Sequence, residues 1–288
     1  MHATVAMFPG QGSQTAEMRD IVEQHTPDLL ELAVSLLGVD PLTRVDEGTR
    51  WAQPAIYCAS LAGWRGAAED VAAFAGHSLG EIAALAAAGA LDERDGLRLV
   101  CARGDLMQRS EAAAAGSGML ALVGPGAHEH AAALRASGVE LVNDNGREQI
   151  VVSGSAAALR RLTDATAGQR VRALRLPVAG AFHTAALRPE VEQLRGILSD
   201  VVVRPPSRPV YSSMLARPFD DPRRQLAEAI AAPVRWRETV NRLVADGIGR
   251  IIDVGPGKTL ARLAAREHPK AIIVRSITAE KEEAAHVG

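Results

Sequence analysis

Short apolar runs that end in glycine-containing turns recur along the chain and predict strands that lead directly into helices. One run, residues 5–8, is broken by Pro-Gly at 9–10, and another, residues 71–75, leads into the turn at 76–80. From Leu79, apolar side chains recur at helical spacing as far as Gly89. This order of strand, turn and helix predicts an α/β body.

Shorter strand-like and helix-like runs alternate after a helical stretch that runs from Leu97 to Gln108. The alanine- and glycine-rich segment 112–118 predicts a helix end that passes into a flexible joint. Beyond it, shorter runs of both types alternate, which is typical of a compact α+β insertion of about 65 residues within the larger body. The strand-like runs are 119–123, 139–142, 150–153 and 171–176, and the helix-like runs are 127–136 and 156–167.

The alternation of strands and longer helices typical of the body resumes after Pro177. The expected elements are a strand at 210–213, helices around 224–231 and 235–246, and a strand at 251–254. Residues 280–288 are small or charged without a core-facing period, so we expect them to fray.

The composition excludes several classes of function. Of the 288 residues, 47% are hydrophobic and 23% are charged, which indicates a globular chain with a sizeable core. The formal net charge of −2 creates no general attraction for nucleic acids or anionic membranes, and 3% aromatic residues do not favour a base-stacking surface. We therefore expect neither a nucleic-acid partner nor a membrane partner.

Cysteine usage and the N-terminus favour a cytoplasmic protein. Cys58 and Cys101 are the two cysteines, and they form no C-x-x-C pattern, so neither a disulfide framework nor a structural metal site is expected. The first residues lack the basic start and apolar run of a signal peptide, and no stretch reaches about 18 apolar residues.

The turn at 76–80 has the pattern G-x-S-x-G, which makes Ser78 a candidate nucleophile. Small flanking residues allow a sharp backbone turn that exposes the serine hydroxyl. A helix that begins at Leu79 would also direct its free N–H groups and positive end toward a reacting carbonyl. The same pattern occurs in purely structural turns, so that alternative stays open.

A serine hydroxyl needs a base within hydrogen-bond reach, and histidine is the usual one. His183 follows the apolar segment 178–182 at a predicted strand-to-loop edge, where a buried ring would face a cleft. A structural histidine is the alternative. His77 adjoins Ser78, but neighbouring residues around so sharp a turn usually point apart, so we expect a supporting role for it.

Two glycine-containing loops do not match nucleotide-binding patterns. After the loop at 8–14, Thr15 stands where a dinucleotide-binding loop requires its last glycine. Before Lys258, Ile252 stands where a phosphate-binding loop requires its first glycine. The first loop favours instead a close approach of a backbone N–H to a substrate oxygen. The second is more simply the start of a helix.

Arg103 lies on an otherwise small and apolar helical face. A cation in such surroundings needs an anion, and the planar guanidinium matches a carboxylate through two parallel hydrogen bonds. The anion is either a side chain of the protein or a substrate, and the sequence leaves both possibilities open.

Taken together, these motifs resemble those of the malonyl-coenzyme A:acyl carrier protein transacylase family, which includes the acyltransferase domains of polyketide synthases. The resemblance covers nearly the whole chain. The matching segments are 8–14, 76–81, Arg103 with Met107-Gln108, Asn143-x-Asn145, Gln149-x-Val151, 181–183, 233–236 and 253–258.

The resemblance implies a hydrolase-like α/β body with a parallel sheet, formed by residues 1–113 and 180–288. Residues 114–179 are expected to form an inserted ferredoxin-like subdomain, with the active site between the two parts. It further implies that Ser78 takes the acyl group and that His183 acts as general base and then as general acid.

The remaining site residues come from the same resemblance. The N–H groups of Gln11 and Leu79 are expected to hold the oxyanion, and Arg103 to pair with the malonyl carboxylate. A backbone carbonyl, near the position where Ala229 replaces a common glutamine, is expected to orient the histidine. Phe182 resembles the malonyl-selecting pattern, because a bulky ring leaves little room for an α-methyl branch.

The implied activity is transfer of a malonyl group from malonyl-CoA to the phosphopantetheine thiol of acyl carrier protein, for fatty-acid or polyketide synthesis and without a bound cofactor. Carrier proteins are usually acidic, and a group of arginines in the small subdomain would suit one, although a solvated face explains them equally well. The arginines are Arg160, Arg161, Arg170, Arg172 and Arg175.

Two alternatives remain. A serine esterase or thioesterase would need an acidic residue between the serine and the histidine in chain order, and the candidates there follow no convincing core strand. An acyltransferase subunit of a malonate-processing complex is the second. The acidic candidates are Asp92, Asp95, Asp105, Asp144 and Asp164.

Overall fold

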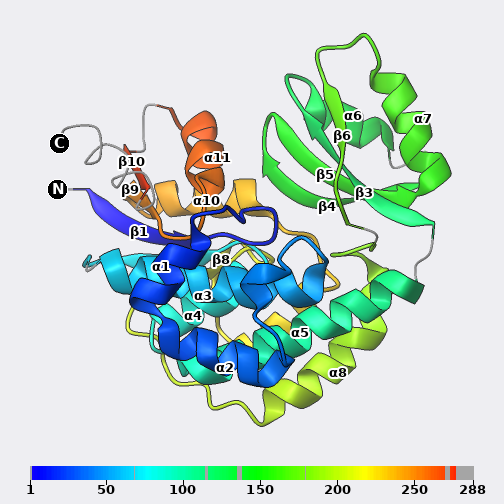
Figure 1. Ribbon diagram of the computed structural model, residues 1–288. Helices are drawn as coiled ribbons and strands as arrows, with labels where there is room; N and C mark the ends of the chain where they lie inside the picture. Colours follow the sequence, from blue (N-terminus) through cyan, green and yellow to red (C-terminus); the bar gives the residue numbers. More distant parts are fainter. Residues whose placement is uncertain are drawn as a thin grey trace, which may run out of the picture.

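The protein has a large body and a smaller lobe, each built around its own sheet (Figure 1). The computed structural model describes residues 2–67, 69–113, 116–134, 138–178, 180–269 and 273–276.

The body sheet confirms the predicted α/β fold with a parallel sheet. Within the described residues it has six strands, and all neighbouring strands are parallel except for the last, short edge strand. The order across the sheet is β10 (Ile273–Ser276), β9 (Ile248–Asp253), β1 (Ala3–Phe8), β2 (Ala73–Gly76), β7 (Val210–Ser212) and β8 (Arg217–Pro218). Because β1, β2 and β9 are parallel, the loops that follow them meet at one edge of the sheet.

Helices cover both faces of this sheet, as the alternation of side chains along β1 requires. Ala6 and Phe8 belong to a core shared with most of the helices, whereas Val5 and Met7 belong to a second core on the opposite face. The helices that pack in the first core are α1 (Met18–His25), α2 (Pro27–Leu37), α3 (Thr49–Ala67), α4 (Gly80–Ala87), α5 (Glu93–Ala113), α8 (Arg188–Ser199) and α9 (Pro222–Ala229). Those that pack in the second core are α10 (Trp236–Ala245) and α11 (Thr259–Glu267).

Within its described residues, the smaller lobe is an antiparallel sheet with two helices, inserted between α5 and α8. The sheet order is β4 (Val139–Gly146), β5 (Gln149–Ser155), β3 (Ser117–Val123) and β6 (Arg172–Arg175), and the helices are α6 (Ala127–Leu134) and α7 (Ala156–Thr166). The expected boundaries at 114 and 179 fall on residues outside the described ranges, so they stay a prediction.

Edge strand β4 joins the lobe to the body. Val234, in the loop before α10, donates its N–H to Val142 O at 2.9 Å and accepts the N–H of Asp144 at 2.8 Å. Arg237 on α10 also forms an ion pair with Asp144. One strand of the small sheet is thereby fixed next to the loops of the body.

Several predicted elements differ from the structure. Strand β2 begins at Ala73 instead of 71, and Ser117 and Gly118 belong to β3 instead of a joint. Among residues 176–178 and 180–184 there is no strand, so the predicted strand edge at His183 is wrong and this residue lies in a turn. Residues 114–115 of the predicted joint, residues 135–136 of the predicted helix and the tail 280–288 lie outside the described residues.

Candidate active site

Ser78 lies at the sharp turn between β2 and α4. Its backbone has a φ of +54°, a conformation that L residues rarely adopt. The flanking glycines are sterically required: a Cβ on Gly76 would lie 2.2 Å from the N of Glu81, and one on Gly80 would lie 2.0 Å from Phe8 O. The G-x-S-x-G pattern therefore allows α4 to pack directly against the ends of β1 and β2.

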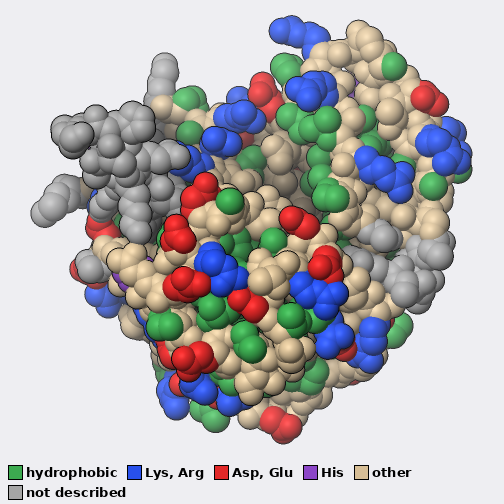
Figure 2. Space-filling model, viewed as in Figure 1, with side chains coloured by type: hydrophobic (Ala, Val, Ile, Leu, Met, Phe, Trp, Pro, Cys, Tyr) green, Lys and Arg blue, Asp and Glu red, His purple; other side chains and the backbone are tan. Residues whose placement is uncertain are grey.

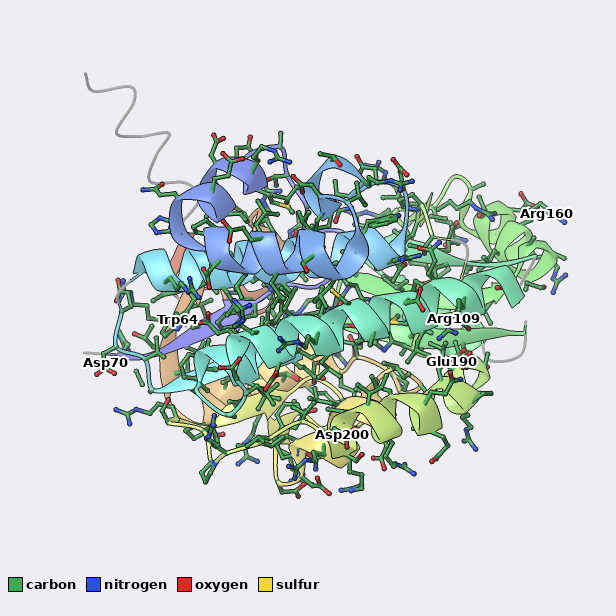
Figure 3. The ribbon with its side chains drawn as sticks, turned by 60° about the horizontal axis from the view of Figure 1, so that its bottom comes forward. Trp64, Asp70, Arg109, Arg160, Glu190 and Asp200 are labelled. Carbon is green, nitrogen blue, oxygen red and sulfur yellow. The ribbon has the colours of Figure 1, made fainter. Side chains whose placement is uncertain are left out.

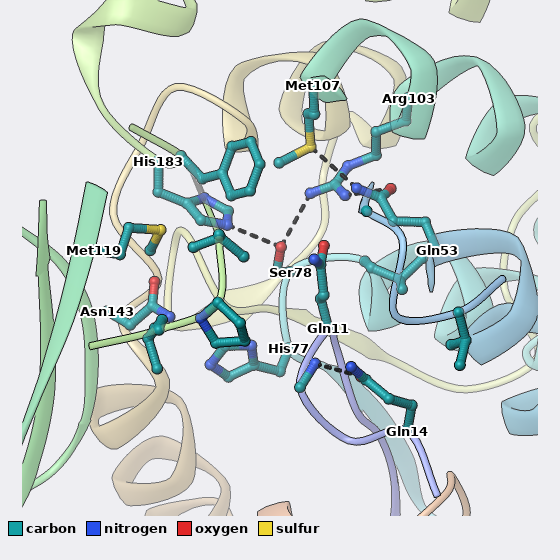
Figure 4. Close-up of a pocket in the computed structure, with 18 of the residues that line it drawn as sticks. Gln11, Gln14, Gln53, His77, Ser78, Arg103, Met107, Met119, Asn143 and His183 are labelled. Carbon is teal, nitrogen blue, oxygen red and sulfur yellow. Dashed lines mark hydrogen bonds between the residues drawn. The ribbon is translucent and has the colours of Figure 1, made fainter. Parts of the chain in front are cut away.

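His183 is 5% exposed and hydrogen-bonds Ser78, with 2.9 Å between Nε2 and Oγ (Figure 4). Its Nδ1 contacts the carbonyl oxygens of Ala229 at 2.9 Å and Ala232 at 3.0 Å. Carbonyl oxygens only accept hydrogen bonds, so Nδ1 carries the hydrogen of the neutral ring. Nε2 is then the acceptor, and the Ser78 hydroxyl donates to it.

The surroundings of His183 favour its neutral form. Burial, with a smaller contribution from the Arg103 charge, lowers the pKa of His183 to about 3. The ring is therefore uncharged near neutral pH and can accept a proton from the serine.

Arg103 is 4% exposed on α5 and donates a hydrogen bond from Nη2 to Ser78 Oγ at 3.0 Å. Its Nη1 donates to Gln53 Oε1 at 2.7 Å, and Gln53 in turn contacts the sulfur of Met107 at 3.2 Å. Burial lowers the pKa of Arg103 to about 10, so it remains charged at neutral pH. Within the described part of the chain no carboxylate forms an ion pair with it, so the salt bridge considered as an alternative is not formed there.

These side chains face a cavity of about 420 Å³ between the lobe and the body, and Figure 2 shows the surface hollowed there. The body contributes the polar groups of the wall, whereas the small lobe and the segment after it contribute mainly apolar ones. The body residues include Gln11, Gln53, His77, Ser78, Leu79, Arg103, Met107, Phe182 and His183, and the others are Met119, Asn143, Leu176, Pro177 and Val178.

Gln11 and Leu79 line the cavity on either side of Ser78. Among the described residues, neither backbone N–H donates a hydrogen bond to another protein group. The loop of Gln11 approaches the serine turn closely, since a Cβ on Gly10 would lie 2.7 Å from His77 O. Both N–H groups thus remain available near the reactive hydroxyl.

His77 and Phe182 shape the cavity. The His77 Nε2 atom lies 2.8 Å from Asn145 Oδ1 on β4, and its ring packs edge-on against Trp236. This arrangement joins the serine turn to the small lobe. Phe182 is 5% exposed and lines the cavity directly before His183.

None of the acidic candidates between the serine and the histidine contacts His183 in the described structure. Asp144 interacts with His128 and Arg237, and Asp92 caps the first turn of α5. The oriented histidine therefore depends on backbone carbonyls, unlike the histidine of an esterase triad.

Sequence reasoning missed several polar residues behind the site. Gln53 holds Arg103, the carbonyl of Ala232 accepts from His183, and Ser213 accepts the N–H of Ser78 at 3.3 Å. The available signal was a lone polar residue in an apolar stretch, as with Gln53 before Pro54 and with Glu81 after the serine turn.

An α/β chain with a serine and histidine paired at a G-x-S-x-G turn has the architecture of a serine-dependent acyltransferase or hydrolase. A family profile described as acyl transferase domain matches residues 39–283, and the chain belongs to this family. Malonyl CoA-acyl carrier protein transacylase from Haemophilus influenzae is 34% identical over 284 residues, which cover 90% of each chain.

Other relatives extend the comparison. The polyketide biosynthesis protein ThaF of Burkholderia thailandensis is 37% identical over 94% of this chain, which spans 24% of that larger protein. The crystal structure of malonyl-CoA:acyl carrier protein transacylase from Xanthomonas oryzae pv. oryzae superposes with a TM-score of 0.88 at 31% identity, covering 99% of this chain and 98% of that one. A malonyl-transacylase in complex with its type II PKS acyl-carrier protein gives 0.84 at 29% identity, covering 98% and 99%.

No helix in the described ranges is long and apolar enough to cross a membrane. The described residues also contain no group of three or more histidine, cysteine, aspartate or glutamate side chains placed to hold a metal ion.

Proposed function

We propose that this protein transfers a malonyl group from malonyl-CoA to the phosphopantetheine thiol of an acyl carrier protein through an ester on Ser78. The transacylase relatives support this activity, and one observation carries it. Arg103, a buried cation with no carboxylate within ion-pair distance in the described structure, donates a hydrogen bond to the hydroxyl of Ser78. One cavity thus combines a reactive oxygen with a site for a carboxylate.

In the acylation step, Ser78 Oγ attacks the thioester carbonyl while His183 Nε2 takes the hydroxyl proton. The carbonyl oxygen becomes an oxyanion, which the N–H groups of Gln11 and Leu79 stabilise. The carbon–sulfur bond then breaks, and His183 returns its proton to the departing thiolate of coenzyme A. The product is a malonyl ester on Ser78.

The transfer step reverses these roles. The phosphopantetheine thiol gives its proton to His183 and attacks the ester carbonyl. The ester bond to Ser78 breaks, His183 reprotonates the serine oxygen, and a new thioester leaves with the carrier protein. The carbonyls of Ala229 and Ala232 accept the hydrogen of Nδ1 throughout both steps, so Nε2 is the nitrogen that gains and loses the proton.

Selection of the acyl group follows from two side chains. Arg103 pairs with the free malonyl carboxylate, which an acetyl group lacks. Phe182 narrows the cavity next to His183 and disfavours an acyl group with an α-methyl branch. His77 supports the turn through Asn145 without taking part in proton transfer.

We also propose the finer features of the assignment. Residues 114–179 form a ferredoxin-like subdomain within a body of 1–113 and 180–288, because the lobe has the element order strand, helix, strand, strand, helix, strand. The enzyme works in the cytoplasm without a bound cofactor, in fatty-acid or polyketide synthesis, and its described cysteines are unpaired.

The small lobe offers a surface for the carrier protein. Arg160 on α7 points outward at the far end of the lobe (Figure 3). Arg170, Arg172 and Arg175 are exposed on and before β6. We propose that these cations attract an acidic carrier.

The test is the intact mass of the protein after brief mixing with malonyl-CoA, followed by addition of a phosphopantetheinylated carrier protein. We expect a malonyl adduct that is absent in Ser78→Ala and that moves to the carrier. Absence of the adduct from the unaltered protein would contradict the acyltransferase assignment. Loss of the adduct to water at the same rate with and without carrier would favour the hydrolase alternative.

A further inference from the structure

A buried carboxylate lies directly behind the serine turn and has no part in the steps above. Glu81, three residues after Ser78 on α4, is 1% exposed. Its Oε1 accepts hydrogen bonds from Ser213 N at 2.6 Å, Ser213 Oγ at 3.0 Å and Ser212 Oγ at 3.1 Å. Three donors on one buried oxygen indicate a position that the fold holds firmly.

The direction of these hydrogen bonds is fixed by chemistry. The Glu81 oxygen only accepts, so the Ser213 hydroxyl uses its single hydrogen for that bond. The same Ser213 oxygen lies 3.3 Å from the backbone N of Ser78, where it accepts the N–H. The chain of donors therefore runs from Ser78 N–H to Ser213, and from Ser213 O–H to Glu81.

The sheet places this chain where it can act on the nucleophile. In the register between β2 and β7, Gly76 lies opposite Ser212, so Ser213 follows directly beside the serine turn. The bond to Ser213 holds the peptide that precedes Ser78, whose φ of +54° is unfavourable for an L residue. It also occupies the Ser78 N–H and leaves the N–H of Leu79 for the oxyanion.

We propose that Glu81 and Ser213 are positioning residues, which orient Ser78 through its backbone N–H. The proposal rests on the proposed function in that Ser78 must be the nucleophile. The nearby Glu81 charge acts to raise the pKa of Arg103, so changes of Glu81 also act on that cation. Ser213→Ala leaves Glu81 and the hydrogen bonds of Arg103 to Gln53 and Ser78 in place, so this variant separates the rate of acylation from recognition of the acyl carboxylate.

The primary test compares two neighbouring serines. Ser213→Ala removes the acceptor of the Ser78 N–H. Ser212→Ala removes a hydrogen bond to the same Glu81 oxygen and the acceptor of the Met214 and Leu215 N–H groups, without touching Ser78. We expect Ser213→Ala to slow acylation by about tenfold or more, with KM for malonyl-CoA within about twofold. The Ser212→Ala rate is expected to stay within about twofold of that of the unaltered enzyme.

A second pair of variants tests Glu81 by rescue. Glu81→Gln keeps an amide oxygen that accepts from Ser213, and we expect acylation within about threefold of the unaltered rate. Glu81→Ala removes the acceptor and is expected to resemble Ser213→Ala. The thermal unfolding midpoint is measured for every variant. If Glu81→Ala does not fold, the comparison of Ser213→Ala with Ser212→Ala tests the proposal.

A second probe separates this proposal from the proposed function. Phenylmethanesulfonyl fluoride sulfonylates reactive serines and carries no carboxylate, and we expect Ser213→Ala to slow its reaction by the same factor. If malonyl-CoA gives no adduct with the unaltered protein, the proposed function fails while the fluoride rates still test the positioning. The proposal would be overturned if Ser213→Ala and the unaltered protein reacted at equal rates, or if both serine variants lost the same factor. It would also be overturned if the unaltered protein reacted with neither malonyl-CoA nor the fluoride.

Discussion

The two walls of the cavity differ in what they contribute. The body wall carries Ser78, Arg103 and His183, and each of these is held by hydrogen bonds to other body residues. The opposite wall carries Met119 and Asn143 from the small lobe and the apolar residues 176–178. The body therefore supplies the groups that react, whereas the lobe supplies the shape of the space in which they react.

Part of the join between the walls lies close to the reactive serine. Strand β4 contacts the body through the backbone of Val234, through Asp144 with Arg237 and through Asn145 with His77. Changes of Ser78 or His183 on the body wall should alter the rate of the chemical step, and a change of Arg103 should alter the choice of acyl group. Changes in the lobe should alter substrate fit and act on the rate only weakly.

The largest effect is expected for His183→Ala. Loss of the general base should slow acylation of Ser78 by about 10²- to 10⁴-fold, measured by rapid quench and intact mass. His128→Ala, a matched change in the small lobe, removes a hydrogen bond to Asp144 and should leave the rate within about threefold. Near-normal acylation by His183→Ala would remove this residue as the base.

Arg103→Ala should separate the two acyl groups. Without the guanidinium, kcat/KM for malonyl transfer should fall by about 30-fold or more, while acetyl transfer is spared or improved. Arg98→Ala, an exposed change on the same helix, serves as the control because its partner is Asp95 on the surface. Equal losses with malonyl-CoA and acetyl-CoA would refute the carboxylate role.

Asn145→Ala tests the join from the side of the lobe. His77 loses its 2.8 Å contact, which should raise KM for malonyl-CoA by about two- to tenfold while kcat changes by about twofold or less. Steady-state kinetics measures both constants. A fall in kcat comparable to that of His183→Ala would show that the lobe takes part in the chemistry and would break the distinction between the walls.

The smallest effect is expected from pH. Burial lowers the pKa of His183 to about 3, so the ring stays neutral as the pH falls from 7.5 to 5.5 and acylation should change by about twofold or less. A histidine with an ordinary pKa near 6.5 would lose about tenfold over the same range. A tenfold fall in the acylation rate would mean that the buried ring titrates normally.

The sequence predicted the reacting residues and one group that holds them, the backbone carbonyl near Ala229, but not the distant side chains of Gln53 and Ser213. Ser78 and Arg103 stand out because each departs from a local pattern, one in a glycine turn and the other on an apolar helical face. Gln53 lies 50 positions from Arg103, and Ser213 lies 135 positions from Ser78, so no local pattern links them.

The same limit applies to the fold. Helix α3 is buried on nearly all sides from Ala52 to Gly63, so it lacks the polar face that reveals a surface helix. Residues 180–182 before His183 are apolar but irregular, and His183 itself is fixed to a distant element by the hydrogen bond from its N to Ile230 O. Apolar runs indicate burial, but they do not distinguish a strand from a buried turn.

In the proposed mechanism, one wall of the cavity joins a reactive serine to a carboxylate-binding arginine. The most direct measurement is a competition in which the protein is mixed briefly with equal concentrations of malonyl-CoA and acetyl-CoA and its intact mass is recorded. We expect mainly malonyl on the unaltered protein, mainly acetyl on Arg103→Ala and no adduct on Ser78→Ala. The same ratio of malonyl to acetyl on the unaltered protein and on Arg103→Ala would contradict this mechanism.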